Sequence, residues 1–363
     1  MQKIEDPQNI GSFTETEKSL LREQEKPSED IGSLTPPLLE LAYGKKLYHL
    51  AVPKELGGAE LSVPSFMEIF ESASYLNGSF GWNLTLGAGA GVFGAYMNPD
   101  FAEEVFSGSK AFITGSGYPA GRAQPADDDP NSFVASGRWK YASGSPYATL
   151  FTASCLLPGS TPDNPKMIAL AFYPDEVNKL QTWNSYGLTA TGSHDFEVDN
   201  VGVPRCRSFI MEPQPEYADR PLYRFPFMQF APATLASSML GITRAFISEA
   251  DPDGEHVPEE PVLKQRERLY GAVQTVWERC EHGEEIPEGE KQSVENASKK
   301  MAAVCRQVAF EVYQQSGMAV LDRSSRLNRT WRDLMTAGQH AMLRAQGAGF
   351  RVQGIDKRFT SSR

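Results

Sequence analysis

The residues best suited to acid–base chemistry lie near the end of the chain, in the run QQSGMAVLDRSSRLNRTWRDLMTAGQH from Gln314 to His340. An imidazole has an unperturbed pKa of about 6.5, so His340 could accept a proton from a phenol or an amine. Because a phenol has a pKa of about 10, this role requires nearby donors that stabilise the developing charge. The structural alternative is a helix histidine bonded to a backbone carbonyl, and the motif around His340 favours a catalytic role.

A second group of candidates combines glycines with hydroxyl side chains in the segment FITGSGYPAGRA. Gly115 and Gly117 would let main-chain N–H groups approach a flat heterocycle, because glycine has no Cβ. Thr114 and Ser116 add hydroxyl donors. Glycine-rich turns between strands are also common without a ligand, so this segment needs support from other motifs.

Two further segments could line the same site. In GRWKYASGSPYATLF, Trp139 offers a large flat surface and Ser143 a hydroxyl group. Their structural alternatives are a core tryptophan and a strand serine bonded to the backbone. In the turn from Gly187 to Ser193, Thr191 adds another hydroxyl group. This turn either covers one end of the same site or is only a structural turn before the next strand.

The elements that must position these residues follow from the periodicity of apolar residues. From Glu15 to about Glu104, and again beyond Pro226, apolar residues recur every three or four positions, which predicts helices. Between about residues 110 and 212 the period is two, which predicts strands. In SHDFEVDNVGVP the alternation slips once at Asp199-Asn200, which indicates a turn or bulge.

Two of the later helices are expected at about residues 263–280 and 289–315, each with an apolar stripe suited to a bundle. The changes of periodicity divide the chain into three expected domains. These are an N-terminal helical domain (1–109), a central β domain (110–213) and a C-terminal helical bundle (214–363).

Composition narrows the function classes. The formal charge of -11 and the pI near 5.1 argue against a nucleic-acid partner, which would need a basic face. Four cysteines without a C-x-x-C pair favour free thiols in a reducing cytosol over a disulfide frame or a metal site. The N-terminal segment lacks a secretory apolar core, and the longest apolar region, Leu84 to Tyr96, is shorter than the ~20 residues that span a bilayer. We therefore expect a cytoplasmic protein with no membrane segment.

Gln314, Gly317, Ser324, Arg329 and Asp333 keep the order and spacing of the C-terminal signature of acyl-CoA dehydrogenases. The segment with Trp139 and Ser143 also resembles the Gly-x-Trp-x-x-x-Ser-Gly strand of that family, and the resemblance spans nearly the whole chain. It implies an α+β fold, with an N-terminal helical domain, a small central β-barrel or sandwich and a C-terminal four-helix bundle. Arg329 and Asp333 are one turn apart and are expected to pair with each other or across a subunit interface.

Eight residues after Asp333, where many dehydrogenases have a catalytic glutamate, this chain has Ala341, which cannot take a proton. Arg-Asp-Leu followed by Gln339-His340 instead resembles the flavin-dependent monooxygenases that share the fold and depend on a separate reductase. This resemblance implies the oxygenase component of a two-component system, which hydroxylates a small aromatic or amine-bearing substrate through a flavin C4a-hydroperoxide. The implied partners are a flavin reductase, O₂ and further copies of the chain in a homotetramer.

The same resemblance assigns roles to residues. It implies His340 and Ser143 as catalytic residues. Met318 and Val320 replace family glycines at the FAD-adenine end, which leaves FMN and FAD both open. The implied contacts to the reduced flavin are Thr114, Gly115, Ser116, Gly117, Trp139, Ser143, Thr191, Ser193, Gln314 and Gly317.

Substrate contacts are expected from aromatic side chains. Many aromatic hydroxylases carry a second histidine after Gly-Trp, but here Gly81-Trp82 leads into NLTLGAGAGVFGAY, which has none. Trp82, Tyr96 and Tyr118 are therefore the candidate substrate-binding residues. Arg244 is a candidate phosphate partner, because a guanidinium binds phosphate bidentately. The other four histidines lack such a context and are interpreted as surface or packing residues: His49, His194, His256 and His282.

Two alternatives stay open. The first is an acyl-CoA dehydrogenase or flavin oxidase whose base lies on an earlier helix, with Glu249 as an example. The second is a non-catalytic member of the fold that serves as a binding or scaffold subunit, which the incomplete signatures suggest.

Overall fold

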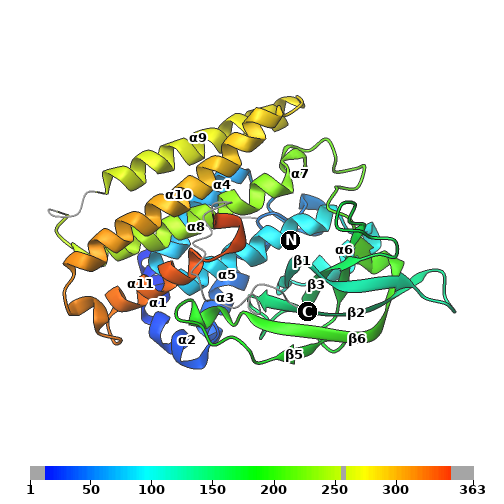
Figure 1. Cartoon of the computed structure of the whole chain (residues 1–363), viewed down its shortest axis with the longest axis horizontal. Coiled ribbons are helices and arrows are strands. Elements are labelled where there is room, and N and C mark those ends of the chain that lie inside the picture. Colours follow the sequence, from blue (N-terminus) through cyan, green and yellow to red (C-terminus); the bar gives the residue numbers. More distant parts are fainter. Residues whose placement is uncertain (1–12, 255–258, 345–363) are drawn as a thin grey trace.

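A computed structural model describes residues 13–254 and 259–344 of the chain (Figure 1). The N-terminal part is helical, and its helices begin at polar caps. Thr14 and Glu17 form a reciprocal capping box, and Ser62 and Asn77 cap the fourth and fifth helices. The helices are α1 (Glu15–Glu23), α2 (Glu25–Ile31), α3 (Pro36–Gly44), α4 (Val63–Leu76), α5 (Gly78–Gly89) and α6 (Pro99–Phe106).

The middle of the chain forms one seven-stranded sheet with the order β5-β6-β2-β1-β3-β4-β7. β1 and β3 are parallel and the other neighbours are antiparallel. The expected slip at Asp199-Asn200 is a register shift between β6 and β2, and Asn200 has a φ of 54°. The strands are β1 (Ile113–Pro125), β2 (Ser132–Ala142), β3 (Leu150–Leu156), β4 (Met167–Phe172), β5 (Asn178–Leu180), β6 (His194–Pro204) and β7 (Ser208–Phe209).

Helices return after the sheet. The expected helices at 263–280 and 289–315 correspond to α9 and α10. Figure 1 shows α9 and α10 as a long antiparallel pair on the side of the molecule away from the strands. The helices are α7 (Pro221–Arg224), α8 (Phe227–Ala250), α9 (Glu260–His282), α10 (Glu288–Gln315) and α11 (Arg326–Ala337).

α8 is the central helix of the helical part. It packs against α4, α10, α11 and α5. Among the described residues it is the helix long and apolar enough to cross a membrane, and most of it is buried inside the protein. Such burial is typical of a core helix, because a helix that is apolar on all sides needs protein neighbours.

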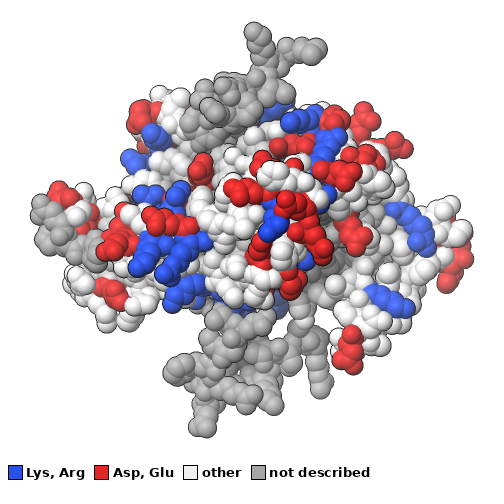
Figure 2. Space-filling view, turned by 90° about the horizontal axis from the view of Figure 1, so that it is seen from above, with Lys and Arg blue, Asp and Glu red and all other residues white. Residues whose placement is uncertain are grey.

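Ion pairs join the outer helices. Figure 2 shows acidic and basic side chains interspersed on the face seen from above. Arg279 of α9 bonds Glu290 of α10 at 3.0 Å. The expected phosphate role of Arg244 is not supported, because its guanidinium is engaged inside the fold by Glu71 and Glu259, at 3.0 and 2.6 Å.

Candidate flavin site

Four of the expected hydroxyl residues lie together in the structure, although they come from three separate segments. Ser193 Oγ is 2.7 Å from both Ser143 Oγ and Thr191 Oγ1, and Thr114 Oγ1 donates to the Ser143 carbonyl at 2.6 Å. All four residues are buried. We call Ser143, Ser193 and Thr191 the hydroxyl chain.

The hydroxyl chain has a direction that follows from counting hydrogens. Thr191 Oγ1 lies 2.7 Å from the carbonyl oxygen of Leu188, which can only accept, so the single hydroxyl hydrogen of Thr191 points there. Ser193 must then donate to Thr191, and Ser143 must donate to Ser193. Ser143 Oγ is left with lone pairs and no hydrogen to offer to another group.

The loop that carries Thr191 and Ser193 is fixed to α11 by Asp333. Asp333 Oδ1 accepts from the Leu188 N–H at 2.5 Å, and a Cβ on Gly187 would lie 2.1 Å from the carbonyl carbon of Arg332. This close approach requires glycine at position 187. Leu188 itself has a φ of 51°, which is unusual for a residue with a branched side chain. The loop conformation is therefore held by contacts with α11.

Asp333 does not pair with Arg329 within the chain, so the expected pairing of these two side chains with each other is wrong. Arg329 instead bonds Glu29 of α2 at 2.9 Å and contacts Glu25 at 3.5 Å. The physical reason is that α2 supplies two carboxylates to this face of α11, while Asp333 points toward the loop. Burial raises the pKa of Asp333 to about 7, and the backbone hydrogen bond from Leu188 opposes this rise.

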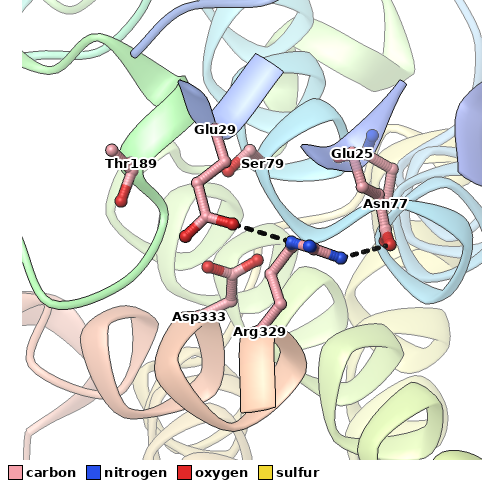
Figure 3. A pocket seen from close by; sticks show the side chains of 7 residues that line it. All are labelled: Glu25, Glu29, Asn77, Ser79, Thr189, Arg329 and Asp333. Atoms are coloured by element: carbon pink, nitrogen blue, oxygen red, sulfur yellow. Dashed lines mark hydrogen bonds and ion pairs between the residues drawn. The ribbon is translucent and has the colours of Figure 1, made fainter. Parts of the chain in front are cut away.

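Figure 3 shows these groups around a small cavity between α2, α5, α11 and the loop. Glu29 and Arg329 point toward each other, and Asp333 lies beside them. The cavity volume is about 10 Å³, close to the space that one water molecule needs. Its lining residues are Glu25, Glu29, Asn77, Ser79, Thr189, Arg329 and Asp333. The cavity is too small for a substrate and is a junction between elements.

His340 lies beyond the end of the last long helix and not on it, because α11 ends at Ala337. Its Nδ1 accepts from the Met342 N–H at 3.4 Å, so the proton of the neutral ring lies on Nε2. Burial, together with a smaller effect of the nearby Arg344, lowers the pKa of His340 to about 4. The imidazole is therefore neutral at pH 7, and in this state it offers a hydrogen-bond donor. Its ring contacts Trp82 edge to face, with centroids 5.9 Å apart.

α5 contacts both His340 and the loop that carries Thr191 and Ser193. Trp82 of α5 contacts His340, and α5 also packs against β1, α11 and the short helix η4 (Thr189–Thr191). Residues 79, 83 and 87 share one face of α5 because they are four positions apart. Ser79 lines the cavity beside Thr189, and a Cβ on Gly87 would lie 2.4 Å from the Phe112 ring next to β1.

Asn83 lies on this face of α5 between those two contacts. It is fully buried, and both its amide nitrogen and its amide oxygen have no protein hydrogen-bond partner among the described residues. A buried primary amide without partners is costly, so native proteins usually satisfy it with a ligand or an ordered water. Asn83 is therefore the clearest sign of a polar ligand between α5 and the strands.

The remaining expected flavin contacts are more dispersed. Trp139 is a core residue, because its ring is fully buried against Phe196 and its Nε1 donates to the Ser154 carbonyl. Gly115 and Ser116 of β1 are partly buried, and the neighbouring Gly117 is exposed. Gln314 lies exposed in the last turn of α10, and the exposed Gly317 beyond the helix has a φ of 58°. These last two residues lie apart from the hydroxyl chain in sequence and have no described contact with it.

The three expected substrate-binding residues are not brought together by any described contact. Trp82 lies against His340, whereas the buried Tyr96 packs beside Phe93. Tyr118 on β1 is exposed. Glu249, the example of a relocated base, is engaged by Arg326 at 2.6 Å.

The other histidines have no described role in this site. His194 accepts from the Trp183 N–H at 3.0 Å, which fits the expected packing role. His49 is buried, which lowers its pKa to about 4. His282 is an exposed helix residue, and His256 lies outside the described residues.

A separate groove of about 530 Å³ lies along the outer part of the sheet. Its polar lining includes Arg122, Ser136 and Asn200. Neither this groove nor the small cavity is lined by Ser143 or His340. Among the described residues, no group of three or more His, Cys, Asp or Glu side chains could hold a metal ion.

Sequence reasoning missed Asn83 and Leu188, and it missed the contact that Asp333 makes with the loop. Asn83 directly follows Trp82, but a single asparagine in a helix carries no signal until its surroundings are known. Leu188 and Asp333 are joined by a contact between residues 145 positions apart, which no local pattern reveals. The ion pairs between α2 and α11 could have been predicted from the sequence. Glu25 and Glu29 are one helical turn apart, and α11 carries arginines at a similar spacing.

Comparisons with known proteins agree with this architecture. Residues 265–345 match the family described as acyl-CoA dehydrogenase, C-terminal domain. The chain is 29% identical to an indole-3-acetate monooxygenase of Pseudomonas putida over 322 residues, which covers 82% of this chain and 80% of the relative. It is 21% identical to the oxygenase subunit HsaA of a flavin-dependent monooxygenase of Rhodococcus jostii, covering 88% and 91% of the two chains.

A solved structure has the same fold. XiaF from Streptomyces, in complex with FADH2 and glycerol, superimposes with a TM-score of 0.80 at 18% identity and covers 93% of this chain and 92% of the other. The fold agrees with the C-terminal family match and with the relatives, which align over most of their length. The C-terminal part of the chain, residues 265–345, matches the acyl-CoA dehydrogenase C-terminal domain. The relatives that the chain resembles over most of its length are monooxygenases, and HsaA is the oxygenase subunit of a flavin-dependent one.

Proposed function

We propose that the protein is the oxygenase component of a two-component flavin-dependent monooxygenase that hydroxylates a small aromatic or amine-bearing substrate. The observation that carries this proposal is the buried amide of Asn83, which has no hydrogen-bond partner among the described residues and lies on the α5 face between β1 and the loop that carries Thr191 and Ser193. The relatives named above support reduced FMN or FAD as the group that this site holds, supplied by a separate flavin reductase.

The side chains present fit a flavin ring chemically. Its polar edges need hydrogen-bonding groups, and Asn83, Ser143 and Ser116 supply both donors and acceptors. When bound, reduced flavin supplies the two electrons that activate O₂ for transfer to the substrate. Ser143 holds the ring through its hydroxyl oxygen, and Asn83 satisfies its amide on the ring or on the substrate.

The neutral His340 then orients the substrate. Its Nε2–H donates to a phenol oxygen or another acceptor, while Trp82 forms an apolar wall beside it. Burial of this region keeps water out, which protects the oxygen-transfer step from loss as hydrogen peroxide. A cationic role for His340 is disfavoured, because its pKa near 4 keeps the ring neutral at pH 7.

The test is to mix the protein with anaerobically reduced FMN or FAD, add O₂ and candidate substrates, and measure hydroxylated product and hydrogen peroxide. Indole-3-acetate is the first candidate because a relative is named for it. His340→Ala should lower the yield of product per reduced flavin, whereas His282→Ala, on an exposed helix surface, should leave it unchanged. Equal yields in both variants would remove His340 from the mechanism.

The two alternatives have distinct outcomes in the same experiments. Anaerobic bleaching of bound oxidised FAD by an acyl-CoA would support a dehydrogenase. Failure to bind flavin in either redox state would support a non-catalytic member of the fold.

We also propose a cytoplasmic homotetramer. Phe310 and Met318, near the end of α10, are 53% and 78% exposed, which is unusual for large apolar side chains and suits a contact between copies. Sedimentation of the protein, compared with that of Phe310→Glu, measures the assembly.

A further inference from the structure

We propose that the small cavity in Figure 3 binds one water molecule that links a protonated Asp333 to Glu29 and so holds the loop 187–193 on α11. The proposal concerns the protein without flavin and therefore stands apart from the proposed function. Because this loop carries Thr191 and Ser193, loss of the proton from Asp333 also affects the candidate flavin site.

The cavity has the size and the polar neighbours that one water molecule needs. Its volume is about 10 Å³. Ser79 lines the cavity and is only 7% exposed, and its hydroxyl group has no hydrogen-bond partner among the described residues. Glu29 accepts from Arg329 at 2.9 Å and from Arg332 at 2.6 Å, and its oxygens keep lone pairs for another donor. A water between Ser79, Glu29 and Asp333 has three partners, the usual number for a buried water.

The charges around the cavity are balanced without Asp333. Three guanidinium groups of α11 pair with three carboxylates of α2 and α8: Arg326 with Glu25 and Glu249, and Arg329 and Arg332 with Glu29. Neither α5 nor the loop residues 185–193 carry a charged side chain. An ionised Asp333 adds a fourth, buried carboxylate, so its neutral form is favoured. In agreement with this balance, burial raises the pKa of Asp333 to about 7.

The proton of Asp333 lies on one oxygen of its carboxyl group. Oδ1 accepts from the Leu188 N–H at 2.5 Å, so the hydrogen of the neutral carboxyl lies on Oδ2. Oδ2 faces the start of α5, where a Cβ on Gly78 would lie 2.7 Å from it. Among the described residues no group accepts from Oδ2, and the carboxyl groups of Asp333 and Glu29 face each other at the cavity (Figure 3). A water can accept the hydrogen of Oδ2 and donate to Glu29.

Loss of this proton makes the junction easier to open. An ionised Asp333 still accepts from Leu188, but it no longer donates to the water and it repels Glu29. Opening of the junction hydrates the buried charge, so the open form becomes more populated as pH rises.

Amide hydrogen exchange of residues 187–193 tests the proton. It is measured by mass spectrometry at pH 6 and pH 8 and corrected for the intrinsic exchange rate. With a pKa of about 7 in the closed junction and 3.8 in the open one, opening should rise about tenfold over this range. Exchange of α9, which packs on α10, α4, α7 and α8, is the reference and should not rise.

Variants of Asp333 separate the neutral form from the carboxylate. Asp333→Asn resembles the protonated carboxyl, because its Oδ1 can accept from Leu188 and its Nδ2 can donate to the water. It should keep the slow exchange of wild type at both pH values, whereas Asp333→Leu should exchange about tenfold faster at both. Glu25→Gln is the matched control, because burial raises the pKa of Glu25 too, and it should keep the pH response of wild type.

Substitutions at Ser79 test the water. Ser79→Val fills the cavity with methyl groups and should raise the exchange at pH 6, because Asp333 loses its acceptor. Ser79→Ala leaves room for the water and should change the exchange less. If the variants of Asp333 do not fold, infrared spectra of wild type serve instead, and the band of a protonated carboxyl group should be present at pH 6 and lost at pH 8.

The outcomes test the proton and the water separately. The proton link is overturned if wild type shows no rise between pH 6 and pH 8 or no such infrared change, if Asp333→Asn exchanges as fast as Asp333→Leu, or if Glu25→Gln loses the response. Equal exchange in Ser79→Val and Ser79→Ala overturns the water site.

Discussion

Replacement of Asn83 by leucine should make the flavin-free protein more stable and should weaken ligand binding at the site. The side chain is fully buried and neither polar atom of its amide has a described partner. In proteins, burying an unpaired amide costs about 1–3 kcal/mol, and leucine of similar size removes this cost while adding apolar contact. We therefore expect Asn83→Leu to raise the free energy of unfolding by about 1–3 kcal/mol and to weaken flavin or substrate binding.

The assay is urea unfolding of the flavin-free protein, followed by flavin binding on the same samples. Asn328→Leu is the matched control, because Asn328 is also buried but its amide is satisfied by the Val320 carbonyl at 2.7 Å and by Arg332 Nε at 2.8 Å. That variant should lose stability, since it leaves both partners unsatisfied. A loss of stability in Asn83→Leu, or unchanged binding of both flavin and substrate, would refute the reasoning.

Three more predictions concern the junction with α11. Burial holds the pKa of Asp333 near 7, above its unfolded value of 3.8, so its contribution to stability is present at low pH and is lost as pH rises through 7. This loss amounts to at most about 4 kcal/mol of the free energy of unfolding. Asp333→Asn should abolish it in unfolding curves taken from pH 4 to 8. If the stability of Asp333→Asn falls with pH as much as that of wild type, the loss does not come from Asp333. The pKa of His340 is lowered to about 4, so wild type should lose stability as pH falls from 6.5 toward 4, and thermal melts of His340→Gln should show a smaller loss. Gly187→Ala should cost about 1–3 kcal/mol because its Cβ would meet Arg332, whereas Gly202→Ala, with open space around its Cβ, should be nearly neutral in the same melts.

The sequence predicted much of the fold, because apolar periodicity is a local property. The period of two between residues 110 and 212 corresponds to strands from Ile113 to Phe209, and the slip at Asp199-Asn200 appears as a bulge. The helices also follow their predicted ranges closely. Hydroxyl residues of the candidate site were found because glycines and a resemblance marked their segments, and four of them do meet in the structure.

What the sequence could not predict depends on packing between distant segments. Arg329 and Asp333 are one turn apart, which suggested a pair, but α2 competes for the arginine and the loop for the carboxylate. The structural alternative for His340, a helix histidine, is also wrong, because α11 ends at Ala337 and His340 lies beyond Gly338. The unsatisfied amide of Asn83 becomes visible only when every neighbour of α5 is in place.

The arginines on α11 have a consequence for synthesis of the chain. Arg326 bonds Glu25, and Arg329 bonds Glu29, across about 300 residues of sequence. While the ribosome is still making the middle of the protein, α2 has carboxylates whose guanidinium partners do not yet exist. Contacts this distant in sequence form late and slow down folding. Glu25 and Glu29 of α2 therefore gain these partners only when almost the whole chain has been translated, whereas the contacts of α1 with α3 and α4 can form earlier.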